Sequence, residues 1–150
     1  MLISSQKANV SRAFFSNLGF SKLCEFPFDS DRKLMSSIFV HKNEDFGHFV
    51  LAKGAPEEIL KVCSSYYPSS ELSFENHLKS ISPIDMDEQF VNLVSEKSLK
   101  MASSGLRVLA LALRRINRSQ ADEISNSNKD TESETNLTFI GLVGLIDPPK

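Results

Sequence analysis

Two long apolar runs constrain the fold of this 150-residue chain more than any other feature. Residues 137–146 carry Leu, Phe, Ile and Val on both faces of an extended chain, whereas a strand with one wet face would alternate apolar and polar side chains. Such a run predicts a strand in the interior of a sheet. Residues 106–113 form a second, almost unbroken apolar run of strand length, which is interrupted near its start by Arg107.

Shorter patterns along the chain complete the fold assignment. Pro56 followed by two glutamates predicts a helix start, and Asp85 or Asp87 can cap a longer helix. The stretch 120–136 is polar and predicts a surface excursion. The other predicted elements are an extended segment over 20–28, strands over 35–40 and 48–52, and helices over 10–18, 56–63 and 85–103. We therefore predict an α+β fold with a mostly antiparallel sheet flanked by helices.

Charge and hydropathy exclude several classes of partner. The 17 basic and 19 acidic residues give a net charge of -2, so no strongly basic surface for nucleic acid is expected. No apolar run reaches the roughly 20 residues that a membrane-spanning helix needs, and the N-terminus does not resemble a secretory signal. We therefore expect this chain alone to be soluble and cytoplasmic, with Cys24 and Cys63 as reduced, buried thiols.

The polar residues do not form a recognisable catalytic or metal site. The three histidines, His41, His48 and His77, lack metal-ligand spacing, and the first two flank a predicted hairpin, where we expect them on the surface. No Gly-x-Ser-x-Gly sequence is present. An independent soluble hydrolase is therefore the least favoured function, and no metal ligand is predicted.

Four segments have residue types suited to binding a nucleotide. In the first, Phe28 precedes Lys33 by five residues, so a ring that could stack on a base lies near an ammonium group. In the second, Lys53 and Gly54 precede a helix start. Taken alone, the first segment is more typical of a core phenylalanine beside a solvated turn, and the second of a plain strand-to-helix turn.

The third and fourth segments are equally open when each is considered alone. Arg107 interrupts an apolar strand and must reach an edge, form a salt bridge or bind an anion; a structural ion pair and a phosphate contact are equally compatible with this position. Asp147 begins an Asp-Pro-Pro sequence that predicts a stiff exit or hinge, although an isolated turn aspartate is the commoner case.

Together and in this order, the four segments resemble the nucleotide-binding domain of a P-type cation-transporting ATPase. The resemblance rests on Glu-Phe-Pro-Phe-Asp-Ser followed by Lys-x-Met-Ser, then Lys-Gly-Ala-Pro-Glu, Gly-Leu-Arg-Val-Leu and Asp-Pro-Pro. These matches extend from Glu25 to Lys150. The sequence is most similar to the fungal-type sodium/potassium-exporting pumps and the calcium pumps of this family.

The resemblance implies a role for each matching residue. Phe28 corresponds to the ring that stacks on adenine. Lys33 and Lys53 correspond to lysines of the adenine pocket, and Gly54 to the glycine that lets the nucleotide approach. Arg107 corresponds to an arginine on the phosphates, and Leu109 to an apolar neighbour of the pocket. The remaining matches are Ser30, where relatives have arginine or serine, Asp147 at the hinge, and Lys150, where arginine is usual.

The resemblance also implies what this chain lacks. The phosphorylation sequence Asp-Lys-Thr-Gly-Thr is absent, as are Thr-Gly-Asp-Gly, the actuator sequence Thr-Gly-Glu and the upstream glutamate that faces adenine. We therefore expect residues 1–146 to be an N-terminally truncated nucleotide-binding domain and residues 147–150 to begin the hinge to a phosphorylation domain. By itself the chain should bind ATP, with Mg²⁺ carried by the nucleotide, but should not hydrolyse it.

The implied setting is an integral-membrane pump. The domain would lie on the cytosolic face, with the phosphorylation and actuator domains as partners, and would present ATP to an aspartate on its neighbour. The alternative is a non-enzymatic remnant or interaction module that keeps the fold without binding nucleotide.

Overall fold

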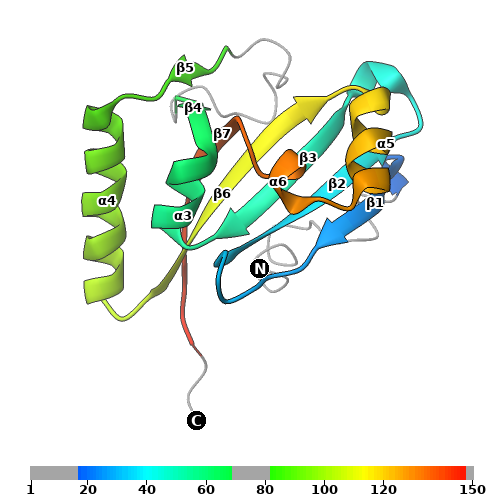
Figure 1. Cartoon of the computed structure of the whole chain (residues 1–150). Helices are drawn as coiled ribbons and strands as arrows, with labels where there is room; N and C mark the ends of the chain where they lie inside the picture. Colours follow the sequence, from blue (N-terminus) through cyan, green and yellow to red (C-terminus); the bar gives the residue numbers. More distant parts are fainter. Residues whose placement is uncertain (1–16, 69–81, 148–150) are drawn as a thin grey trace.

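The chain folds around one seven-stranded sheet with helices on one face (Figure 1). The computed structural model describes residues 17–68 and 82–147. Most of the helix predicted over 10–18 lies outside these residues. The strands are β1 (Phe20–Phe26), β2 (Leu34–His41), β3 (His48–Gly54), β4 (Cys63–Tyr66), β5 (Ile84–Asp85), β6 (Arg107–Ile116) and β7 (Leu137–Leu145). The helices are α3 (Pro56–Val62), α4 (Glu88–Ser103), α5 (Arg118–Ser127) and α6 (Asp130–Ser133), with a 3₁₀ turn at Glu44–Phe46.

The sheet is mixed, with the strand order β1-β2-β3-β6-β7-β4-β5. The α+β class is confirmed, but the expected mostly antiparallel sheet is not, because β4 pairs with β7 in parallel. The reason is the short helix α3 between β3 and β4. It carries the chain back across the sheet, so β4 runs in the same direction as β3 and β7, and parallel strands require such a crossover. The serine-rich stretch after Val62 gave no sign of this strand.

The core lies between the sheet and the helices, which all pack on the same face in Figure 1. β7 lies between β6 and β4, so the interior position predicted from its apolar run is confirmed. Pro56 begins α3, and two acidic residues follow in its first turn, as predicted. The core combines strand residues with the inner faces of the helices: Ile38, Val50, Ala52, Ala110, Ala112, Phe139, Ile59, Leu60, Val94, Ala121 and Ile124.

Helix α4 is anchored by aromatic packing at its N-terminal end. Asp87 caps the helix, and its carboxylate accepts a hydrogen bond from the Phe90 amide at 2.8 Å. The Phe90 ring stacks on Tyr66 of β4, with 3.7 Å between centroids, and meets Phe139 of β7 edge-on. Leu93 of this helix is 48% exposed, because Phe90 and Val94 fill the contact with the sheet. No helix in the described ranges is long and apolar enough to span a membrane.

The polar stretch predicted as a surface excursion instead forms α5 and α6. A reciprocal capping box starts α5, in which Asn117 accepts from the Gln120 amide and Gln120 accepts from the Asn117 amide. Only Ala121 and Ile124 are buried along this helix, spaced three residues apart. This narrow apolar stripe is enough to dock a helix on the sheet but does not stand out from its polar surroundings.

The prediction that His41 and His48 lie on the surface is wrong. Their exposed fractions are 8% and 3%. The Nδ1 atom of His48 accepts a hydrogen bond from the His41 amide at 3.1 Å, so the two residues are linked across the hairpin. The His41 ring packs edge-on against the Phe20 ring, and this contact shields the imidazole from solvent. The histidines therefore join the strands rather than face the solvent.

Both cysteines are free thiols, but each is only partly buried, so the expected full burial is not found. The ionisation of Cys63 should make the free energy of unfolding depend on pH. Burial raises the pKa of Cys63 from 9.0 to about 12. Between these values the folded chain keeps a proton that the unfolded chain releases, so this contribution to stability is complete below pH 9 and is lost as pH rises towards 12. We expect Cys63→Ala to show a smaller loss of unfolding free energy between pH 9 and 11 in urea titrations.

The control for this experiment is Ser64→Ala, which changes the exposed neighbour without removing a titratable group. It should keep the pH dependence of the unmodified chain. An unchanged slope in Cys63→Ala would contradict the assignment to this thiol.

Candidate functional site

The predicted site residues gather at one end of the sheet, which we call the site end. The pairing register aligns Leu34 of β2 with Gly54 of β3, and Gly54 with Ala110 of β6. Ala110 in turn pairs with Leu142 of β7. The start of β2, the end of β3, the start of β6 and the end of β7 therefore lie side by side, at the lower end of the sheet in Figure 1. Segments more than one hundred residues apart in sequence meet there.

The face of the sheet opposite the helices forms the floor of this site. Paired residues project to the same face, and the face alternates along each strand. Because Ala52 and Ala110 pack in the core, Lys53 and its partner Leu111 project away from the helices. Met35 pairs with Lys53, and Leu109 lies two residues from Leu111 on the same face. All four side chains are partly exposed, so the floor is apolar around one ammonium group.

The loop 27–33 between β1 and β2 presents Phe28, Ser30 and Lys33 at the site end. Phe28 is 58% exposed, unlike the core phenylalanine that its segment alone would suggest. Ser30 is exposed. Lys33 has the left-handed backbone conformation (φ 56°), and its amide donates to the Asp29 carbonyl at 2.7 Å. Left-handed backbone at a non-glycine residue persists where surrounding contacts hold it, and such residues are common at ligand sites.

Asp29 organises this loop. One of its carboxylate oxygens accepts from the amides of Asp31 and Arg32, at 2.7 and 2.9 Å. These backbone hydrogen bonds, with a smaller contribution from the Arg32 guanidinium, lower the pKa of Asp29 below its usual range. The Asp29 carboxylate therefore holds the backbone of this loop from within.

Gly54 is required by packing between strands. A Cβ atom on Gly54 would lie 2.5 Å from the Lys33 carbonyl oxygen and 2.6 Å from the Leu34 Cα. The Ala55 amide also donates to the Lys33 carbonyl at 3.0 Å, which brings the two segments together. The glycine thus lets the Lys33–Leu34 backbone approach β3. A contact between Gly54 and a nucleotide stays a prediction.

Arg107 forms an ion pair with Asp147. The guanidinium Nη2 and the carboxylate Oδ1 are 3.0 Å apart, and the side chains are 64% and 57% exposed. An ion pair this exposed contributes at most about 1 kcal/mol. The structural alternative for Arg107 is thus realised in this structure, but the guanidinium remains accessible at the site end. Lys150 lies outside the described residues.

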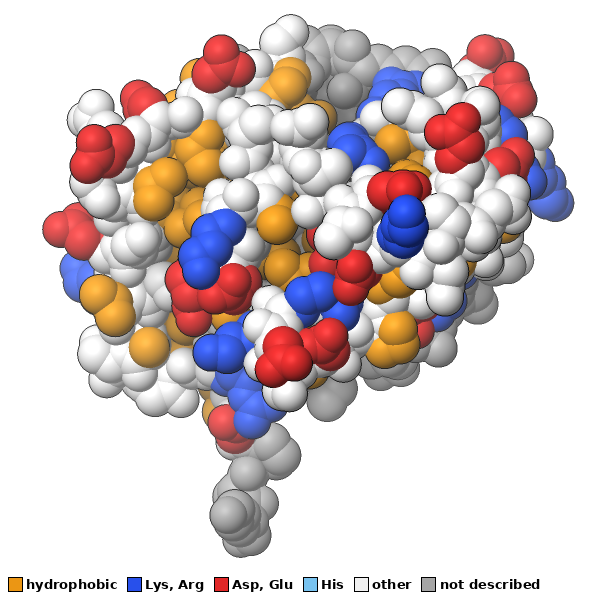
Figure 2. All heavy atoms as spheres, viewed as in Figure 1, with side chains coloured by type: hydrophobic (Ala, Val, Ile, Leu, Met, Phe, Trp, Pro, Cys, Tyr) orange, Lys and Arg blue, Asp and Glu red, His pale blue; other side chains and the backbone are white. Residues whose placement is uncertain are grey.

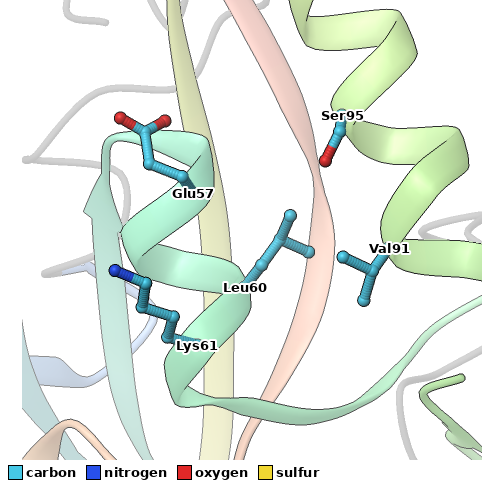
Figure 3. Close-up of a pocket in the computed structure, with 5 residues that line it drawn as sticks. All are labelled: Glu57, Leu60, Lys61, Val91 and Ser95. Atoms are coloured by element: carbon cyan, nitrogen blue, oxygen red, sulfur yellow. The ribbon is translucent and has the colours of Figure 1, made fainter. Parts of the chain in front are cut away.

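Two surface depressions occur elsewhere, along α4 and between α3 and α4. Figure 3 shows the second, in which Leu60 of α3 and Val91 of α4 point towards one another, with Glu57 and Lys61 also on α3 and Ser95 also on α4. These residues lie on the helix-covered side, so neither depression includes a predicted site residue. On this side acidic and basic side chains are interspersed among apolar ones, without a large patch of one sign (Figure 2).

Sequence reasoning did not assign Leu111 or Gly141 to the site. The two residues are paired, and they project to the face of the sheet opposite the helices. A Cβ atom on Gly141 would meet no described atom within 4 Å. A glycine within an apolar strand can mark the close approach of a ligand, which is the signal that could have identified it.

Comparison with known proteins shows the family to which the chain is similar. The family model described as "P-type ATPase, cytoplasmic domain N" matches residues 16–150. A sodium/potassium-exporting P-type ATPase of Saccharomyces cerevisiae is 35% identical over 136 residues, covering 87% of this chain and 11% of the relative. A calcium-transporting ATPase of Bacillus subtilis is 32% identical over 152 residues, covering 100% of this chain and 15% of the relative.

The chain therefore belongs to the family of P-type ATPase cytoplasmic N domains. The human calcium-transporting ATPase type 2C member 1 is 31% identical over 127 residues, so the similarity extends across distant organisms. The chain spans only between about a tenth and a seventh of the length of the relatives described here.

The packing role of Gly54 predicts a large difference between two glycine substitutions. Gly54→Ala should lower the unfolding free energy by about 1–3 kcal/mol, because the new methyl group overlaps the Lys33–Leu34 backbone. Gly141→Ala, in an open position of β7, should change it by less than about 0.5 kcal/mol. Urea denaturation of both variants measures this, and equal losses would contradict the steric argument.

Proposed function

We propose that this chain binds ATP at the site end of the sheet, as the N domain of a P-type cation-transporting ATPase. The observation that carries the proposal is the register that brings Lys33, Lys53 and Arg107, from three distant motifs, to one end of the sheet in a chain of this family. Phe28 would stack on adenine, and the floor at Met35 and Leu109 would contact the base.

The chemistry of the site suits binding and positioning. Within the proposal, the two lysines contact the base, ribose or phosphates, and Arg107 contacts the phosphates as a charge-assisted donor. The nucleotide would bring its own Mg²⁺, which would neutralise part of the charge on the phosphates. The N domain would then present the γ-phosphate to an aspartate of the phosphorylation domain, a task of alignment rather than of covalent chemistry.

The affinity should be modest. Stacking contributes about 1–3 kcal/mol and each charge-assisted contact about 1.5–3 kcal/mol. Association opposes them by at least about 4 kcal/mol. The balance is compatible with a dissociation constant near about 1 mM. Weak binding suits a domain that must release ADP after each transfer.

Titration of the 150-residue chain with ATP, followed by amide NMR, tests the proposal. Signals of Phe28, Lys53 and Arg107 should shift together. Phe28→Ala should weaken binding at least about fivefold by removing the stacking surface. Phe46→Ala is the matched control, since the two rings are 58% and 56% exposed. Signals that stay in place at high millimolar ATP would favour a module that keeps the fold without binding nucleotide.

The role of Arg107 can be separated from that of the ring. Arg107→Ala should weaken ATP about tenfold but leave adenosine unchanged, because only ATP offers phosphates to the guanidinium. Arg118→Ala is the control, as it also removes an exposed arginine paired with an aspartate. Isothermal titration with both ligands measures the difference. Equal weakening of ATP and adenosine would argue against a phosphate contact.

A further inference from the structure

One side chain, Arg32, ties the loop 27–33 together. Its guanidinium Nη2 donates to the carbonyls of Pro27 at 3.0 Å and Leu34 at 3.2 Å, which lie at the two ends of the loop. Its Nη1 donates to the carboxylate of Asp29 at 2.9 Å. The side chain is only 22% exposed, although its neighbours in the loop are largely exposed. Arg32 thus fixes both ends and the middle of the segment that carries Phe28 and Lys33.

The residue that anchors Arg32 is Glu134, which lies 102 residues away in the sequence. The Glu134 carboxylate accepts hydrogen bonds from Arg32 Nε at 2.8 Å and from Arg32 Nη2 at 3.1 Å, which makes a bidentate ion pair. The Glu134 side chain is only 5% exposed. The Ser36 hydroxyl of β2 donates to the same carboxylate at 2.9 Å. Arg114 of β6 donates to the carbonyls of Glu132 and Thr135, on either side of Glu134. The carboxylate is therefore held rigidly against the core.

We propose that the Arg32–Glu134 pair is a positioning device that sets Phe28 and Lys33 in the geometry for binding the nucleotide. This inference rests on the proposed function. Phe28 lies between Pro27 and Asp29, and Lys33 lies between Arg32 and Leu34, so each proposed contact is flanked by residues that this network holds. Arg32 itself does not contact the nucleotide; it acts through the loop.

Stability alone does not account for the pair. Taking two charges from water can offset their mutual attraction, so a buried ion pair is weak evidence for stabilisation. Burial raises the pKa of Glu134 despite the opposing hydrogen bonds from Arg32 and Ser36, so desolvation outweighs the stabilisation that these hydrogen bonds give to the ionised carboxylate. The definite gain is geometric, since a planar guanidinium with several donors can hold two carbonyls and two carboxylates at once.

Two conservative variants test this role through ATP affinity. Arg32→Lys keeps the positive charge but cannot reach both loop ends and Glu134 together. Glu134→Gln keeps the shape but loses the charge. We expect each to weaken ATP at least about threefold and the double variant to be no weaker than the worse single one, because both disrupt one unit. Amide signals of Phe28, Asp29 and Lys33 should shift in both variants before ATP is added.

The direction in which Glu134→Gln changes ATP affinity distinguishes a positioning role from a purely electrostatic one. Removing a negative charge favours an anionic ligand at long range, so electrostatics alone would tighten ATP binding, whereas loss of positioning weakens it. Ile116→Val, at the opposite end of β6, is the stability control: it deletes a buried methyl and should leave ATP affinity unchanged.

The outcomes distinguish the two proposals. If the unmodified chain binds ATP and both variants bind it equally well, or if Glu134→Gln binds it more tightly, the positioning role is wrong while the proposed function stands. If Ile116→Val weakens ATP as much as Arg32→Lys does, the effect is one of general stability and the positioning role is again wrong. If the unmodified chain does not bind ATP, both proposals fail.

Discussion

The ladder β2-β3-β6 runs in one register, and the position of every candidate site residue depends on it. Side chains alternate between faces along a strand, so a slip of one residue would turn Lys53 into the core and an alanine out to solvent. Gly54 marks the point where this register leaves no room for a side chain, because the Lys33–Leu34 backbone lies against it. The same alignment places the loop 27–33 at the same end of the sheet as the start of β6.

The two faces of the sheet differ in their side chains. The helix-covered face is filled by small and branched apolar side chains, among which Ala52, Ala110 and Ala112 let the helices approach closely. The opposite face has longer, partly exposed side chains around Lys53 at the site end. A surface that is apolar yet cationic would suit the nucleotide proposed above, since the apolar side chains could contact a base and the ammonium group could attract phosphates.

Much of the fold could be predicted from the chain because the deciding signals are local. Pro56 and Asp87 set the starts of two helices, and the apolar run of β7 requires neighbours on both sides. Predictions were wrong where packing outweighed composition. The polar helix α5 forms because its two apolar residues, Ala121 and Ile124, pack in the core. His41 is buried because its ring packs against Phe20 and its amide bonds to His48 across the hairpin. The parallel pairing of β4 depends on a crossover that no residue of β4 encodes.

The candidate site could also be predicted from the sequence only in part. The ordered motifs were enough to predict the family and to single out Phe28, Lys33, Lys53 and Arg107, since each motif is a short contiguous string. Gathering them at one end of the sheet requires strand pairing, and holding the loop requires Glu134, which is remote in sequence and lies in a stretch predicted as a surface excursion. The sequence by itself determined which residue types and strings are present. Only the tertiary structure decided which of them meet, because hydrogen bonding between strands and burial of a distant carboxylate are not properties of any local segment.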